Sequence, residues 1–203
     1  MIIHIHPETP QQRKVDQVVE LLRKGEVIIY PTDTSYGMGC DISNKKAIDK
    51  VYALKKMDRR KPMSFVCRDL SHLSEYAAQV STSNFRIMKR LLPGPYTFIL
   101  GASREVPRII MNKQRTVGIR VPDNPTCLSM IETLGHPILS TSIFAEEDEM
   151  LTDPRDLDDI WGSRVGAIVS GGIMVRSMSS VVDLTGPEPE VLREGIGDVT
   201  PWL

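Results

Sequence analysis

The chain has 203 residues, of which 25 are Lys or Arg and 26 are Asp or Glu, and its formal net charge is -1. This length suits a single domain spanning residues 1–203, and the balanced charge excludes a histone-like polyelectrolyte. The three cysteines, Cys40, Cys67 and Cys127, are widely spaced and form no CxxC pair, which excludes a disulfide framework and a structural zinc site.

Apolar and polar periodicity in the first third of the chain predicts alternating strands and helices. Residues 2–6 have the pattern of a strand, and Thr9 with Pro10 is typical of a helix start. The helix is predicted to end at Gly25, which follows two basic residues. Residues 27–30 are continuously apolar, as expected for a central strand covered on both faces.

The same alternation continues to the C-terminus. Asn44 is predicted to cap a second helix and residues 63–67 to form a strand. A helix over 81–92 must end at the Pro-Gly-Pro segment 93–95. Further strands are predicted at 96–100, 117–121, 138–140, 167–169, 180–184 and 191–193, with helices capped by Asn124 and starting at Asp153. Because the last strands have no helices between them, we expect an α/β fold with an open, twisted, mixed sheet and flanking helices.

No feature of the sequence indicates a membrane protein. The apolar runs fall short of the ~18 residues that a spanning helix needs. The first six residues lack the basic start and apolar length of a signal peptide. We therefore expect a cytoplasmic protein without a membrane partner.

Hydroxyl side chains are concentrated in two segments that follow predicted strands. Residues 31–39 (PTDTSYGMG) combine three hydroxyls, a phenol, a carboxylate and two glycines, which suits donors facing a polar ligand and close backbone approach. Residues 140–142 (STS) form the second segment. A plain Ser/Thr turn explains any one of these residues, but the whole set favours a ligand pocket.

Basic side chains are concentrated in one segment. Residues 45–68 contain nine Lys or Arg against two Asp: Lys45, Lys46, Lys50, Lys55, Lys56, Arg59, Arg60, Lys61 and Arg68. A solvated helix face is the plain explanation. Residues 55–61, however, leave a helix and enter a strand, and such loops form ligand crevices in open α/β sheets. The segment therefore predicts a basic cleft that binds a nucleotide or RNA phosphate.

Other common sites lack their sequence patterns. There is no GxxxxGK[ST] loop, and Gly37-Met38-Gly39 lacks the third glycine of a dinucleotide fingerprint. His4 and His6 share a strand face but have no recognisable third metal ligand. The acids of 146–159 favour a solvated loop and helix over an ion site. Cys40 has no identifiable base, so a nucleophilic thiol is disfavoured.

A series of motifs in a fixed order resembles the YrdC/YciO family over most of the chain. The motifs lie at 31–39 (PTDTSYGMG), 54–55 (LK) and 61–63 (KPM), 93–97 (PGPYT), 117–122 (VGIRVP), 140–142 (STS), 180–183 (SVVD) and 193–195 (REG). The family fold is an open twisted α/β sheet around a positively charged cleft. YrdC members are threonylcarbamoyl-adenylate synthases acting in tRNA modification, with ATP, threonine and bicarbonate as substrates.

The resemblance implies a role for individual residues. Thr32, Thr34, Tyr36 and Arg120 are expected at a threonine-like substrate, with Arg120 on its carboxylate. The residues expected at ATP or AMP are Lys55, Lys61, Ser140, Ser142, Ser180 and Arg193. Magnesium is expected to accompany ATP, whereas no metal-binding residue is assigned. Lys56, Arg59 and Arg60 are the candidates for RNA phosphates.

Three positions depart from the pattern of YrdC-type members. Met57 stands where they have the arginine of a Lys-x-Arg motif, Val66 where they have a histidine, and Phe144 where they have the asparagine of Ser-Ala-Asn. Each change removes a polar contact. Together they indicate the YciO branch and weaken the expectation of synthase activity more than that of a nucleotide pocket.

Three functional hypotheses follow. The first is a nucleotide- and RNA-binding protein that recognises tRNA or double-stranded RNA by shape and phosphates and is linked to threonylcarbamoyl-adenosine modification. The second is an active threonylcarbamoyl-AMP synthase in which Arg59 or Arg60 replaces the missing arginine. The third is an enzyme for another small amino or carboxylic acid, or for the modified nucleoside itself.

Overall fold

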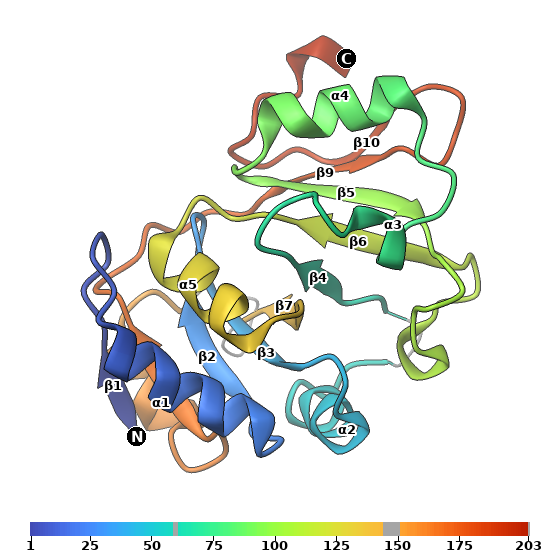
Figure 1. Cartoon of the computed structure of the whole chain (residues 1–203). Helices are drawn as coiled ribbons and strands as arrows, with labels where there is room; N and C mark the ends of the chain where they lie inside the picture. The colour runs from blue at the N-terminus through green and yellow to red at the C-terminus, as the bar shows by residue number, and fades with distance from the viewer. Residues whose placement is uncertain (59–60, 144–150, 203) are drawn as a thin grey trace.

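The computed structural model describes residues 1–58, 61–143 and 151–202 and contains one open mixed sheet with helices on both faces (Figure 1). The strands are β1 (Ile2–His4), β2 (Ile28–Pro31), β3 (Tyr36–Asp41), β4 (Ser64–Val66), β5 (Tyr96–Gly101), β6 (Thr116–Arg120), β7 (Ile138–Ser142), β8 (Ala167–Ser170), β9 (Ser180–Asp183) and β10 (Glu190–Arg193). The helices are α1 (Gln12–Arg23), α2 (Lys45–Leu54), α3 (Leu73–Tyr76), α4 (Thr82–Leu91), α5 (Pro125–Leu134) and α6 (Pro154–Trp161), with short 3-10 turns at Arg108–Ile110 and Thr200–Trp202. The predicted α/β class is confirmed.

The ten strands lie in the order β1-β8-β2-β3-β7-β4-β6-β5-β9-β10. Parallel pairs join β1 to β8, β8 to β2, β4 to β6 and β5 to β9. The remaining neighbours are antiparallel. Short connections account for the antiparallel pairs β2–β3 and β9–β10, because antiparallel neighbours need only a tight turn whereas parallel ones need a crossover. The predicted mixed sheet is therefore confirmed.

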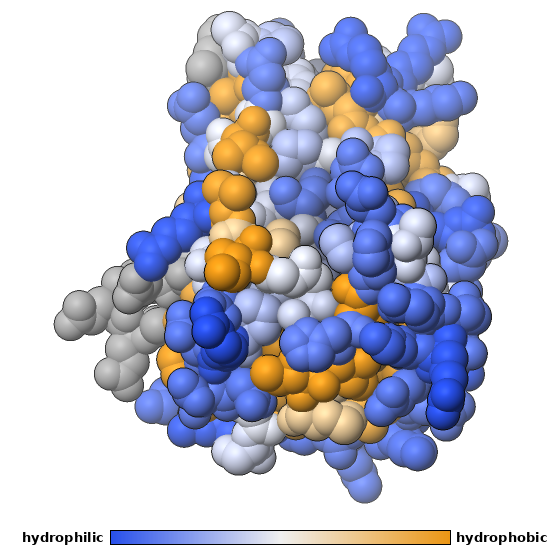
Figure 2. Space-filling model, turned by 90° about the vertical axis from the view of Figure 1, so that its left-hand side faces the viewer, coloured by the Kyte–Doolittle hydropathy of each residue, from blue (hydrophilic) through white to orange (hydrophobic). Residues whose placement is uncertain are grey.

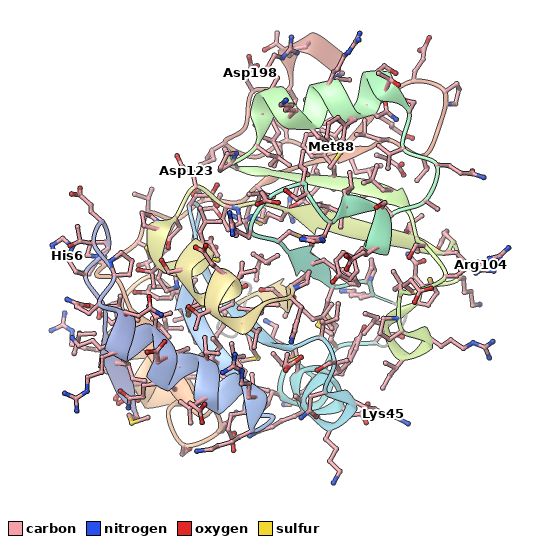
Figure 3. All side chains as sticks on the ribbon, viewed as in Figure 1. His6, Lys45, Met88, Arg104, Asp123 and Asp198 are labelled. Carbon is pink, nitrogen blue, oxygen red and sulfur yellow. The ribbon has the colours of Figure 1, made fainter. Side chains whose placement is uncertain are left out.

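The helices cover the two faces of the sheet unequally. Helices α1 and α5 pack against each other and against β2, in front of the lower part of the sheet in Figure 1. Their apolar residues form one core with alternate residues of the strands beneath, including Val66 and Ile138. A second core on the opposite face takes residues of α2 and α4, among them Met88, which points from α4 toward the sheet in Figure 3.

Several predicted helix starts are confirmed. The side chain of Asn44 accepts a hydrogen bond from the amide of Ala47, and that of Asn124 accepts one from Cys127 at the start of α5. Each cap satisfies an amide that the helix itself leaves unpaired. The predicted start of α1 is wrong: its N-cap is Gln11, which makes no side-chain cap bond, and the helix begins two residues after Pro10.

Both hydroxyl segments are expected to follow strands, and both lie largely within strands. Only residues 32–35 turn, and Tyr36 already starts β3, which pairs with β2 from Pro31 to Ile28. The second segment is the end of β7, where Ser142 lies opposite Gly37. The glycines concealed this hairpin, because Gly37 and Gly39 weaken the strand pattern in the sequence. Glycine is needed at position 39 for a steric reason, because a Cβ there would lie 2.8 Å from the ring of Tyr30.

The surface is that of a folded domain with scattered apolar residues. Figure 2, which views the side carrying β1 and α1, shows hydrophilic residues broken by separate hydrophobic patches. Among the described residues, no helix has both the length and the apolar character needed to cross a membrane.

Candidate functional site

A polar cavity of about 240 Å³ lies over one face of the sheet, on strands that α1 and α5 leave uncovered. Its lining is rich in hydroxyls from six segments: Thr32, Ser35, Tyr36, Ser64, Thr97, Ser140, Thr141, Ser142 and Ser179. Two guanidinium groups, Arg120 and Arg193, complete the polar lining, and no carboxylate belongs to it within the described chain. Such a surface offers many hydrogen bonds and a positive potential to a small anionic ligand.

Strand register explains why this face of the sheet leaves room for a cavity. Ser64 lies between Ser140 of β7 and Gly118 of β6, and Gly118 lies opposite Ile99 of β5. Because alternate residues of a strand share one face, small side chains from three neighbouring strands line up on the same side of the sheet. A Cβ on Gly118 would already stand 3.1 Å from the hydroxyl of Ser64.

Arg120 ends β6 and is held by the turn between β2 and β3. Its Nη2 donates to Oδ1 of Asp33 at 2.6 Å, to Oγ1 of Thr34 at 2.6 Å and to Oγ1 of Thr32 at 3.2 Å. The ion pair is deeply buried, with 11% of the Arg120 side chain and 8% of the Asp33 side chain exposed. Two of the residues predicted at the threonine-like substrate, Thr32 and Thr34, therefore meet at the guanidinium of the third, Arg120.

Arg193 approaches the cavity from β10. Its Nε and Nη2 donate to the carbonyl of Ser179 at 3.0 and 2.9 Å, and Nη2 also reaches the Ser179 hydroxyl. Burial lowers the pKa of Arg193, and the like charge of Arg120 lowers it further. Two cations thus influence one another across the cavity, and an anion between them relieves that repulsion.

Residues 171–178, the segment between β8 and β9, are hydrogen-bonded to the hairpin turn and to the start of β3; we call this segment the strap. The phenol of Tyr36 donates to the carbonyl of Gly172 at 2.7 Å, and the hydroxyl of Ser177 donates to the carbonyl of Thr34 at 2.8 Å. Burial raises the pKa of Tyr36, so this phenol is a neutral donor at physiological pH. The hairpin turn and the strap are therefore fastened to each other.

The structure does not show the predicted basic cleft among the residues it describes. Lys55 ends α2, Lys56 follows with a positive φ of 48°, and Lys61 is exposed before β4. None of these three lines the cavity, although Pro62 and Met63, which follow Lys61, do. Arg59 and Arg60 lie outside the described residues. The cations that line the cavity in the described chain are the two arginines above.

The other predicted residues take different positions. Ser140 and Ser142 line the cavity, whereas Thr34 lies just beneath it on Arg120. Ser180 is fully buried, donates to the carbonyl of Gly197 at 2.6 Å and accepts from the amide of Gly195, so it fixes the segment after β10. Of the three departures, Val66 lines the cavity and Met57 packs against the core, while Phe144 lies outside the described residues.

Several residues in or next to the cavity were not predicted from the sequence. Ser64, Thr97 and Ser179 stand alone among apolar strand residues or in a loop, and Asp33 was noted only as part of a turn. The sequence signal for the cavity face of the sheet is a hydroxyl or glycine at alternate positions of otherwise apolar strands. The buried thiols offer no alternative chemistry, since burial raises the pKa of Cys40 and of Cys67 to about 12.

The fold and cavity define a class of protein: an α/β domain with a ten-stranded mixed sheet and a hydroxyl-lined cavity on the face that helices leave open. Residues 20–195 match the family model of Sua5, YciO and YrdC, whose description is "Telomere recombination". The chain therefore belongs to the Sua5/YciO/YrdC family.

Similar proteins fall into two groups, YciO proteins on one side and threonylcarbamoyl-AMP synthases and Sua5 on the other. The protein is 43% identical over 202 residues to YciO of Escherichia coli K12, with 98% of each chain covered. It is 29% identical over 183 residues to the threonylcarbamoyl-AMP synthase of Vibrio vulnificus, covering 89% of this chain and 98% of the relative. The crystal structure of E. coli YciO covers 100% of this chain and 99% of its own, with a TM-score of 0.94 and 42% identity.

The group with Sua5 includes a crystal structure with bound L-threonine. Sua5 of Pyrococcus abyssi in complex with L-threonine superimposes with a TM-score of 0.90 at 26% identity. The match covers 96% of this chain and 57% of that protein. The likeness thus extends from YciO to a protein that binds an amino acid.

Proposed function

We propose that the protein is a nucleotide- and RNA-binding protein of the YciO type, linked to threonylcarbamoyl-adenosine modification of tRNA. The observation that carries the proposal is the cavity lined by two arginines of like charge and nine hydroxyls. Guanidinium groups bind phosphate through several parallel hydrogen bonds, and hydroxyls suit the ribose and base edges. Whole-chain similarity to YciO supports the branch.

The nucleotide is proposed to lie along β7 and the end of β10. Ser140, Ser142 and Arg193 line this part of the cavity. Ser180 acts from below, by holding residues 195–197 in place. Lys55 and Lys61 are assigned to the entrance, where a phosphate tail would leave the cavity.

A small threonine-like group is proposed to occupy the other end of the cavity. Thr32, Tyr36 and Arg120 lie there, with Thr34 supporting the guanidinium. Val66 gives this end an apolar wall. The amino acid bound to P. abyssi Sua5 supports such a subsite.

RNA is proposed to contact the loop after α2 through Lys56, Arg59 and Arg60. Phosphate contacts release counterions, so binding to a tRNA or a double-stranded RNA weakens linearly on a log-log plot against salt. The proposal also includes a cytoplasmic location and a single domain over residues 1–203.

Two titrations test the proposal. Calorimetry with AMP and ATP is expected to show one site per chain, lost in the Ser142→Val variant. Fluorescence anisotropy with a tRNA is expected to show affinity that falls as salt rises, with a shallower slope when Lys56, Arg59 and Arg60 are all changed to Gln. A triple variant of Lys45, Arg13 and Arg86 to Gln has the same charge loss elsewhere and serves as the control. Equal salt slopes in both triple variants would contradict the RNA site.

An active threonylcarbamoyl-AMP synthase is the second candidate. It is supported by the 29% identity to the Vibrio synthase and by the amino-acid-binding Sua5 relative. Pyrophosphate release that requires both threonine and bicarbonate would establish it. ATP turnover without threonine would instead favour a related enzyme with another substrate.

Magnesium would enter the site with ATP. The described lining of the cavity provides hydroxyls and guanidinium groups but no carboxylate, so its side chains are poor ligands for this ion. No protein-bound metal is therefore assigned a place in the cavity.

A further inference from the structure

Two glycines of β3 keep a path open for the side chain of Tyr30, which lies on β2 opposite Gly37. The second glycine, Gly39, lies opposite Ser140 of β7. A Cβ on Gly39 would stand 2.8 Å from the Tyr30 ring. A Cβ on Gly37 would stand 3.6 Å from that ring and 3.0 Å from Oγ of Ser140. The ring therefore reaches diagonally across β3 toward Ser140, whose hydroxyl lines the cavity.

The phenol oxygen of Tyr30 is buried and, within the described chain, has no hydrogen-bond partner of ordinary geometry. Burial raises the pKa of this phenol, and the neighbouring Ser140 hydroxyl opposes the rise. Tyr30 is thus a neutral O–H group at physiological pH. An unpaired O–H in a buried place is costly, and Oγ of Ser140 is an acceptor beside it.

The hydroxyl of Ser140 can serve a ligand at the same time. It donates to the carbonyl of Met38 at 3.3 Å. Such a distance is long for a bond between two oxygens, which is usually about 2.8 Å, so a ligand acceptor in the cavity can take this proton instead. Because a hydroxyl has one proton and two lone pairs, Ser140 can accept from beneath while it donates into the cavity.

We propose that Tyr30 is a positioning residue of the nucleotide site: its phenol donates to Oγ of Ser140 from beneath the cavity, which leaves the proton of Ser140 for an acceptor atom of the bound nucleotide. The proposal rests on the nucleotide site proposed above. Tyr30 is not part of the described cavity lining, so it acts through Ser140. Its effect is the same for AMP and ATP, because Ser140 faces the nucleoside part that the two ligands share.

A double-mutant cycle tests the proposal. It comprises the wild type, Tyr30→Phe, Ser140→Ala and the double variant, each measured by calorimetry with AMP and by urea unfolding without ligand. Tyr30→Phe keeps the ring and is expected to weaken AMP binding by about three- to tenfold, the worth of one neutral hydrogen bond. In the Ser140→Ala background the same change is expected to alter the affinity by less than about twofold, because the hydroxyl through which the phenol acts is gone.

Urea unfolding follows the same bond without a nucleotide. Tyr30→Phe is expected to lower the urea midpoint of the wild type, because Ser140 loses its donor. In Ser140→Ala the phenol has no partner, so Tyr30→Phe is expected to leave the midpoint unchanged or to raise it. Tyr76→Phe is the matched control, because it removes a partly buried phenol whose ring packs edge-on against Phe65, outside the described cavity lining. It is expected to change the AMP affinity by less than about twofold in both backgrounds.

Two results would overturn the proposal. They are a Tyr30→Phe variant that binds AMP as tightly as the wild type, and a loss of affinity that is equal in the two backgrounds, as a role of Tyr30 in folding alone would give. If the wild type binds neither AMP nor ATP, the proposed function itself fails. Urea unfolding then decides on Tyr30: effects of the two substitutions that add independently overturn its bond to Ser140, and coupled effects support it.

Discussion

The phenol oxygen of Tyr36 lies 2.7 Å from the carbonyl oxygen of Gly172, a residue 136 positions later in the chain, and donates a hydrogen bond to it. The same oxygen accepts a hydrogen bond from the amide of Gly171 at 3.3 Å. One side chain at the start of β3, which also lines the cavity, thus holds the strap by its backbone. Both partners are backbone groups, so this contact uses no side chain of the strap.

Replacement of Tyr36 by Phe is expected to loosen the strap. The variant keeps the ring but leaves the backbone groups of Gly171 and Gly172 without this partner, at a cost of about 1 kcal/mol in the free energy of unfolding. Hydrogen exchange over residues 171–178 should accelerate, because local opening becomes easier. The amides of α4, on the opposite face of the sheet, serve as the internal reference. Unchanged exchange in the strap would show that Tyr36 does not fasten it.

Replacement of Gly118 by Val is expected to fill the floor of the cavity. The first added carbon already lies 3.1 Å from Oγ of Ser64 and 3.3 Å from Cγ2 of Thr97, and the valine methyls extend further into the space. Nucleotide affinity should fall at least tenfold, with a loss of about 1 to 3 kcal/mol in stability. Gly101→Val, at the end of β5, adds the same side chain where the nearest atom is 3.5 Å away, outside the lining. Equal loss of binding in both variants would contradict the site.

Replacement of Arg193 by Gln is expected to weaken binding of AMP and ATP alike. The variant removes the cation that Ser179 orients toward the cavity, so affinity should drop by roughly tenfold to a hundredfold. Arg104, which Figure 3 shows at the edge of the molecule, is exposed and provides the matched control as Arg104→Gln. Binding that survives in Arg193→Gln but not in the control would refute the assignment.

Alkaline pH is expected to destabilise the protein through its buried thiols. Burial raises the pKa of Cys40 and of Cys67 from the ordinary 9.0 to about 12. Below pH 9 both states hold these protons, so the thiols add no pH dependence there. As the pH rises from 9 toward 12 the unfolded chain ionises first, and the free energy of unfolding decreases. Urea unfolding at pH 8 and pH 10 measures the decrease, and a thiol reagent should react at pH 8 only after unfolding.

The sequence predicted the helices and most strands because their signals are local. Asn44 and Asn124 cap helices through bonds to residues three positions away, and the apolar periodicity of α1 and α4 sets their buried faces. The β2–β3 hairpin was missed because Gly37 and Gly39 serve the packing of Tyr30, a contact between residues on different strands.

The site was predictable in part for the same reason. Hydroxyl-rich segments and arginines in recognisable motifs identified Thr32, Tyr36, Arg120, Ser142 and Arg193, all of which line the cavity. Their relationships were not predictable, because the register between β4, β6 and β7 decides which hydroxyls share a face. The pairing of Asp33 with Arg120 spans 87 positions and appears only once the strands are placed.

A crystal structure of the protein with AMP tests the central claim most directly, namely that this cavity is the nucleotide site. The expected result is a phosphate on the guanidinium of Arg193, with the ribose and base over Ser140 and Ser142. The chain has a second polar cavity of about 290 Å³, lined by His72, His136 and Glu132 at the far end of α5. AMP bound there, or bound elsewhere with the hydroxyl-lined cavity filled only by water, would contradict the account.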